Sequence, residues 1–366
     1  MIFLSVKKLL FCSEIAQNVD LAQMGREVNK VSGRFFLLRA LSVLIVLLLV
    51  FTLPACADRD DDEKISIVCT LFAQYDWMRN IIGDSEQVEL KLLVANGADV
   101  HSYQPSAADI VAIAECDMIV YLGGGSDAWV SEAITRSGRE DVKKIALAEC
   151  EGVTLHDISS SSHSHGGHED HDDHEDHEGH NHGTLDEHLW LSLKNASVLT
   201  SVLCDALCDL DPENAQRYRE NAARYILELS YLRLDFDIAV AKSDESERFM
   251  LFCDRFPFVY LLEELEIEYS AAFEGCSADV DADFGTVIGL IGEAKEHKVR
   301  FIAITESSDG SLARTVANEI KDREVKVLTF NSMQAVSKKE IDGGCSYLSI
   351  MRENLRALTI ALGAED

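Results

Sequence analysis

Segments that alternate between apolar strand-like patterns and helical patterns restrict the fold of this 366-residue chain more than any other feature. A first series of such segments runs from residue 64 to residue 149. A second series begins at "RFMLFCD", residues 248–254, and closes with a helical pattern at 347–362. Alternation of this kind predicts parallel sheets with helices on both faces, which is the α/β class.

Two consecutive helical segments separate the two series. The second is long, and Pro212 lies close to its start, where proline suits the first helical turn. We therefore expect two α/β lobes joined by a long helix, with a ligand bound in the cleft between the lobes. The boundaries predicted from the sequence are an N-terminal lobe at 65–190, linking helices at 191–243 and a C-terminal lobe at 244–366.

The N-terminus has the pattern of an export signal. A basic flank precedes a short apolar run at residues 40–53, which ends in "LPAC". This ending resembles a bacterial lipobox, so we expect residues 1–56 to form a signal peptide, with Cys56 becoming the lipid-bearing first residue. The polar stretch at 57–64 is then a tether, and Met24 offers an alternative start. An uncleaved anchor helix is the other interpretation, although the run is shorter than the ~20 residues of a membrane span.

Charge and cysteine content narrow the partners and the chemistry. The formal net charge of −31 argues against nucleic acid or anionic lipid as a ligand and is compatible with cations. Ten cysteines in an exported chain would suggest disulfides, but their spacing is irregular and no CxxC pair is present. We expect mostly buried free thiols, with a disulfide framework as the alternative.

A histidine-rich acidic loop at residues 161–183 interrupts the N-terminal lobe. Imidazoles and carboxylates at this density bind Zn²⁺, Cu²⁺ or Ni²⁺ weakly at several alternative places, so we expect a low-affinity metal loop. A solvated acidic insert without a role is the alternative. The histidines of this loop are His163, His165, His168, His171, His174, His177, His180 and His182.

Other candidate ligands follow strands, where parallel sheets place their ligand sites. His101 follows the second strand pattern, and His188 precedes a helical pattern. Cys253 and Asp254 end the first strand of the second lobe, and Asn331 ends its last strand. Imidazole and thiolate suit Zn²⁺. Each residue also has an ordinary explanation, as a core or surface histidine, a buried thiol, or a turn or capping residue.

Several motifs together resemble the zinc- and manganese-type solute-binding lipoproteins of bacterial ABC importers. "HSYQPSAADI" resembles the segment with the first ligand of that family, and "DEHLWLSLKNA" resembles the segment with the second. "TESSDGSLARTVANEI" and "GGCSYLSIMRENLRAL" are similar to its C-terminal segments. The resemblance implies two lobes joined by a rigid backbone helix, with a metal ion held between them by residues that include His101 and His188. It also implies a membrane permease as partner.

The second lobe departs from that family's pattern. Cys253 stands where the family usually has His or Glu, and Asn331 stands where it usually has an acid. Cys276 and Glu306 also follow strand patterns and could complete the ligand set. A thiolate ligand would favour Zn²⁺ over Mn²⁺, because Mn²⁺ prefers oxygen. We therefore expect a zinc site made of His101, His188 and one or two of these four residues.

The resulting expectation is a monomeric, lipid-anchored, extracytoplasmic receptor for Zn²⁺ that supplies an ABC-importer permease, and not an enzyme. A manganese receptor of the same family and an adhesin-type lipoprotein are the alternatives. A hydrolytic zinc enzyme would need a general base beside an open metal position, and the chain contains no HExxH motif. A receptor for metal chelates would need a large apolar pocket rather than imidazoles at strand ends.

Overall fold

The computed structural model describes residues 64–95, 97, 100–157, 185–274 and 282–364. These residues belong to one compact unit, Lys64–Asp366. Several sequence expectations lie outside the described residues, namely the signal peptide with Cys56, the tether up to residue 63, the histidine-rich loop at 161–183, and Cys276.

The N-terminal lobe is built on a parallel four-stranded sheet with the strand order β2-β1-β3-β4. Its central strands are almost wholly buried, which explains why their sequences are continuously apolar rather than alternating. The elements of this lobe are β1 (Ile65–Cys69), α3 (Phe72–Ile82), β2 (Val88–Leu92), α4 (Ala107–Glu115), β3 (Met118–Tyr121), α5 (Ala128–Ser137) and β4 (Lys143–Ala146).

The C-terminal lobe repeats this arrangement with the strand order β6-β5-β7-β8, again all parallel. The predicted α/β class with two parallel sheets is therefore confirmed. The elements are β5 (Phe249–Phe256), α8 (Val259–Glu264), β6 (Glu268–Glu274), α9 (Phe284–Glu296), β7 (Phe301–Thr305), α10 (Ser311–Glu319), β8 (Lys326–Phe330), α11 (Lys338–Asp342) and α12 (Tyr347–Ala361).

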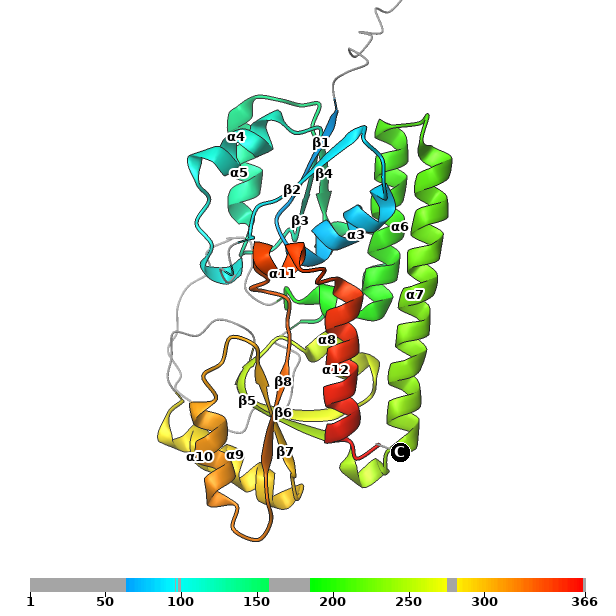
Figure 1. Cartoon of the computed structure of the whole chain (residues 1–366). Coiled ribbons are helices and arrows are strands. Elements are labelled where there is room, and N and C mark those ends of the chain that lie inside the picture. Colours follow the sequence, from blue (N-terminus) through cyan, green and yellow to red (C-terminus); the bar gives the residue numbers. More distant parts are fainter. Residues whose placement is uncertain (1–63, 96, 98–99, 158–184, 275–281, 365–366) are drawn as a thin grey trace, which may run out of the picture. The chain divides into compact units, whose positions relative to one another are not determined.

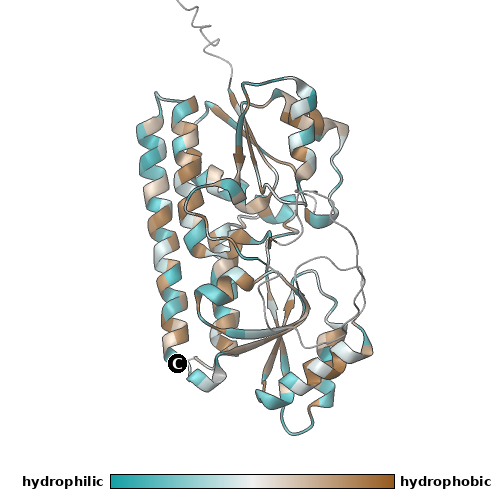
Figure 2. Cartoon of the chain, turned by 180° about the vertical axis from the view of Figure 1, so that it is seen from behind, coloured by the Kyte–Doolittle hydropathy of each residue, from teal (hydrophilic) through white to brown (hydrophobic). Residues whose placement is uncertain are grey.

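Two long helices connect the lobes, α6 (Leu193–Leu210) and α7 (Ala215–Lys242), and they lie side by side (Figure 1). The last helix, α12, packs against α7, α3 and β8, so the end of the chain contacts elements of both lobes. Teal and brown alternate along α6 and α7 in Figure 2, as expected for helices with one buried face.

One large apolar cluster joins the two lobes. It contains residues from β1, α3, the linking helices, β5 and α12, including the fully buried Trp77, Trp190 and Tyr347. Trp77 packs edge-on against Tyr347, with ring centroids 5.4 Å apart. A smaller cluster lies in each lobe, on the side of α4 and α5 in the first and of α9 and α10 in the second. The shared cluster fixes the strand ends of both lobes to the linking helices.

Ser106 is the N-cap of α4, where its side-chain oxygen accepts from the backbone N–H of Asp109 at 3.3 Å. All seven cysteines within the described ranges are free thiols, which confirms that expectation for this part of the chain. Among the described helices, none combines the length and the apolar character that a membrane span requires.

Candidate metal centre

His101 and His188 come together although 87 residues separate them in the sequence. His101 lies in a single 3-10 turn, Val100–Ser102, after β2, and His188 immediately precedes another, Leu189–Leu191. Their Nε2 atoms are 3.1 Å apart. Two nitrogens bound to one tetrahedral Zn²⁺ at ~2.0–2.1 Å would be roughly 3.3 Å apart, so the pair is spaced for a shared ion.

The hydrogen bonds of His188 determine which of its nitrogens can bind a metal. Nδ1 of His188 lies 3.0 Å from Oδ1 of Asp186, which also accepts from the backbone N–H of His188 at 2.8 Å. A carboxylate only accepts, so Nδ1 carries a hydrogen, and in the neutral ring the lone pair is then on Nε2. Both side chains are buried, with 2% of His188 and 4% of Asp186 exposed. Such carboxylate–histidine pairs orient metal ligands in many proteins.

A second chain of hydrogen bonds assigns the nitrogens of His101 in the same way. Ser126 donates its hydroxyl hydrogen to the carboxylate of Glu187. The Ser126 oxygen, 2.7 Å from Nδ1 of His101, must therefore accept from that nitrogen. The backbone N–H of Ser126 also donates to Glu187 at 3.0 Å, which fixes the loop after β3. The Nε2 atoms of His101 and His188 consequently face the same point between the two rings.

Gln334, a residue of the second lobe, reaches this pair and was not among the residues selected from the sequence. Its amide nitrogen lies 2.6 Å from Nε2 of His188 and 3.1 Å from Nε2 of His101. It follows β8 in "NSMQAVS", a stretch in which only Asn331 was singled out. A polar residue within a few positions of the end of a parallel strand was the available signal.

The other candidate residues of the second lobe have different neighbours. Cys253 is 2% exposed and belongs to the apolar cluster beside α9 and α10, where burial raises the pKa of its thiol to about 12. Asp254 was expected to end its strand, but β5 continues to Phe256; Asp254 accepts from the backbone N–H and the hydroxyl of Thr305, at 2.9 and 2.6 Å, and so links β5 to the end of β7. No contact tests whether Cys253 binds metal, and its role as a ligand stays a prediction.

Glu306 and Asn331 hold the segment that carries Gln334. Glu306 accepts from the backbone N–H and the hydroxyl of Ser332, both at 2.8 Å. The side-chain oxygen of Asn331 accepts from the backbone N–H of Met333 at 2.8 Å, as a turn residue would. Neither arrangement tests direct metal binding. Within the ranges that the structure describes, no three His, Cys, Asp or Glu side chains are grouped as a metal site.

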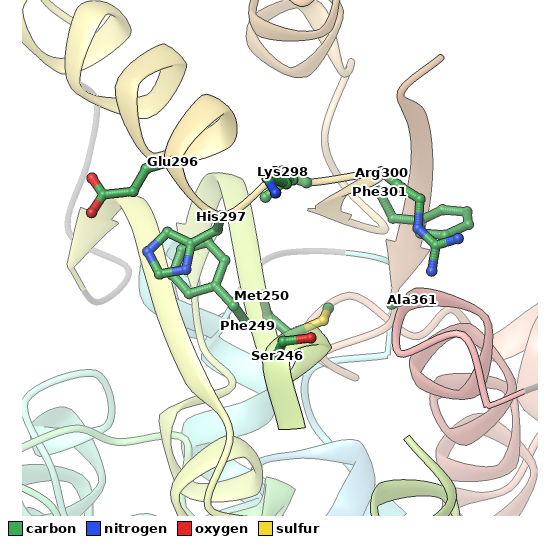
Figure 3. A pocket seen from close by; sticks show the side chains of 10 residues that line it. Ser246, Phe249, Met250, Glu296, His297, Lys298, Arg300, Phe301 and Ala361 are labelled. Atoms are coloured by element: carbon green, nitrogen blue, oxygen red, sulfur yellow. The ribbon is translucent and has the colours of Figure 1, made fainter. Parts of the chain in front are cut away.

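A separate pocket of ≈ 340 Å³ lies at the opposite, amino ends of β5 and β7 (Figure 3). Phe249 and Phe301 begin these strands, and His297 stacks on Phe249 with ring centroids 3.7 Å apart. Ligand sites of parallel sheets lie at the carboxyl ends of the strands. His297 therefore lies outside the candidate site.

Two parallel α/β lobes joined by long helices, with two oriented imidazoles between strand ends, define a metal-receptor class of solute-binding protein. A family model described as "Zinc-uptake complex component A periplasmic", ZnuA, matches residues 67–361. The chain belongs to this family.

Individual relatives agree with this assignment. The chain is 29% identical over 300 residues to "High-affinity zinc uptake system protein ZnuA" of Bacillus subtilis, covering 82% of this chain and 88% of that protein. It is 27% identical over 324 residues to "Zinc-binding lipoprotein AdcA" of Streptococcus pneumoniae. That match covers 88% of this chain but only 60% of AdcA.

Solved structures show the same fold. The metal-dependent lipoprotein YcdH of Bacillus subtilis matches with a TM-score of 0.65 and 25% identity, covering 82% of this chain and 99% of that one. The Zn(II)-bound ZnuA-like domain of Streptococcus pneumoniae AdcA matches with a TM-score of 0.63 and 23% identity, covering 82% and 99%. The second likeness shows the fold alone.

Proposed function

We propose that this protein is an extracytoplasmic receptor that captures Zn²⁺ between its two lobes and delivers it to an ABC importer, rather than an enzyme. The observation that supports this most is the pair of Nε2 atoms 3.1 Å apart on His101 and His188, each ring oriented by an acceptor at Nδ1. Two preoriented imidazoles need no rearrangement of their rings before they bind a cation.

Zinc is preferred over manganese by the chemistry of this pair. Imidazole nitrogen suits Zn²⁺, whereas Mn²⁺ prefers carboxylate, carbonyl and water oxygens. The Asp186 and Glu187 carboxylates are engaged at Nδ1 of His188 and at Ser126, respectively. The names of the relatives ZnuA and AdcA, a zinc uptake protein and a zinc-binding lipoprotein, support the same choice.

The sequence and the relatives support a location and a partner for this proposal. The lipobox ending at Cys56 supports a lipid anchor, in keeping with the lipoprotein relatives. A family named for a zinc-uptake complex supports a membrane permease as the receiving partner. The histidine-rich loop precedes His188 directly in the sequence and would collect Zn²⁺ weakly beside the tight site.

Zinc titration against a competing chelator tests the tight site. His188→Ala should lower the affinity by about 100-fold or more, because it removes a ligand rather than an outer partner. His156→Ala and His297→Ala are matched controls, since these histidines contact Glu263 and Phe249 rather than the pair. Equal losses in all three variants would contradict the assignment of the site.

A further inference from the structure

Gln334 links the two lobes at the metal site itself. It comes from the segment after β8, 146 residues from His188 and 233 from His101, and is only 7% exposed. The segment also docks on the first lobe through its backbone, because the N–H of Lys338 donates to the carbonyl of Ala95 at 2.6 Å. The contact of Gln334 with the histidine pair is therefore a contact between lobes.

The end of the amide that faces the pair is set by the ring nitrogens. In the neutral rings both Nε2 atoms carry lone pairs, because both Nδ1 atoms donate. The Gln334 amide nitrogen has two hydrogens, one for each lone pair, at 2.6 and 3.1 Å. In this arrangement, the amide hydrogens occupy the two ring acceptors that a cation would use.

The backbone that carries Gln334 is held on both sides. The indole N–H of Trp190, two residues after His188, donates to the carbonyl of Ser332 at 2.9 Å. The carboxylate of Glu306 accepts twice from the same serine. Met333 adopts a left-handed conformation with φ of 64°, stabilised by its hydrogen bond to Asn331. These contacts fix the Gln334 backbone at the site, so only its side chain needs to move.

We infer that Gln334 is a metal ligand supplied by the second lobe and that its side-chain amide rotates by a half-turn when the ion binds. Amide hydrogens cannot face a cation, but the carbonyl oxygen of the same group can, and it reaches the same place after a half-turn about the last side-chain bond. The amide nitrogen then donates to the two Nε2 atoms when no ion is bound, and the amide oxygen coordinates the ion when one is bound. This inference rests on the proposed function of His101 and His188 as zinc ligands.

A neutral second-lobe ligand has a direct consequence for selectivity and release. Two imidazoles and an amide are all neutral, so these three ligands compensate none of the charge of the ion. The ion is therefore held less tightly than it would be with a carboxylate in place of the amide. The imidazoles still favour Zn²⁺ over Mn²⁺. Gln334 would thus set the affinity at a level from which a receptor can transfer its ion.

Two substitutions of Gln334 test the inference. Gln334→Leu removes the amide oxygen and should lower Zn²⁺ affinity by about tenfold or more. Loss of a residue that only supports a metal ligand already lowers metal affinity by about tenfold, so loss of a ligand should cost at least as much. Gln334→Glu supplies a charged oxygen and should raise the affinity by about tenfold or more. Gln216→Glu is the matched control, because it makes the same chemical change on the exposed face of α7 and should leave the affinity unchanged. All variants keep the histidine-rich loop, and thermal melting of the metal-free proteins checks folding.

Rotation of the Gln334 amide can be followed by NMR spectroscopy. In ¹⁵N-labelled protein, the side-chain amide resonances assigned by their loss in Gln334→Leu should shift on addition of one equivalent of Zn²⁺. Unchanged or increased affinity in Gln334→Leu would overturn the inference, since a residue that only competes with the ion would raise affinity when removed. If His188→Ala still weakens binding in that case, the proposed function stands without this ligand. Full affinity in His188→Ala would overturn both.

Discussion

Nδ1 of His188 donates to the carboxylate of Asp186 across 3.0 Å, and this contact decides which ring nitrogen is available to a metal. Both residues belong to one short segment, "DEH", whose middle residue, Glu187, fixes the second histidine through Ser126. Three consecutive residues thus supply one candidate ligand and orient both. The segment is more important to the site than the many histidines that precede it in the sequence.

Asp186→Asn should lower Zn²⁺ affinity by about 10- to 100-fold, the usual cost of losing an outer-shell partner of a metal ligand. The substitution keeps the shape of the side chain but removes the charge that supports Nδ1–H of His188. Competition titration measures the effect. Asp205→Asn, on the exposed face of α6, is the control, and an equally small effect of both variants would contradict the role of Asp186.

Asp127→Asn should change how stability depends on pH. Burial raises the pKa of Asp127 to about 6, assisted by the nearby Glu187 and opposed by the backbone N–H groups of Leu122 and Gly123. In the unfolded state the Asp127 carboxyl has its ordinary pKa of 3.8, so the folded state holds this proton more tightly. The contribution of Asp127 to the free energy of unfolding then falls as pH rises from about 4 to about 6.

The asparagine variant lacks this titration, so its stability relative to the natural protein should increase by up to about 3 kcal/mol between pH 4 and pH 7. Urea unfolding of both metal-free proteins at several pH values measures the difference. Asp205→Asn provides the reference for an exposed carboxyl. A constant difference between the Asp127 variant and the natural protein across this range would show that Asp127 keeps an ordinary pKa.

Cys253→Ala distinguishes a buried thiol from a thiolate ligand. From its apolar surroundings we expect a loss of stability of about 1 kcal/mol for the small cavity, with no change in Zn²⁺ affinity. Cys116→Ala, a similarly buried thiol in the apolar cluster of the first lobe, should behave alike. A selective fall in affinity for the Cys253 variant would instead support the ligand that the sequence suggested.

Deletion of residues 162–183 should leave one tight Zn²⁺ site and remove several weak ones, because the loop would bind at many alternative positions while the tight site needs only preoriented residues. Isothermal titration calorimetry separates the two classes by their enthalpy and stoichiometry. Loss of the tight site with the loop would place the specific ligands in the loop.

Particular residues show how far sequence patterns extend. The buried strand at Ile65–Cys69 and the helix that Ser106 begins were predictable, because apolar continuity and capping are local properties of the chain. His101 and His188 were also selected from the sequence, through strand ends and through motifs that resemble a known family. Whether they bind one ion was a question of spacing in three dimensions, which local patterns do not contain.

The sequence by itself determined the two α/β series, the helical segment between them and the two histidines, since each depends on neighbouring residues. The tertiary structure alone decided which atoms face each other. Ser126 became the orienting partner of His101 because the carboxyl ends of β2 and β3 lie at the same edge of one parallel sheet. Gln334 reached the site because Trp190 of the first lobe binds its segment and Glu306 holds that segment within the second lobe. Contacts between such separate segments depend on packing of the whole fold, and no local pattern in either segment encodes them.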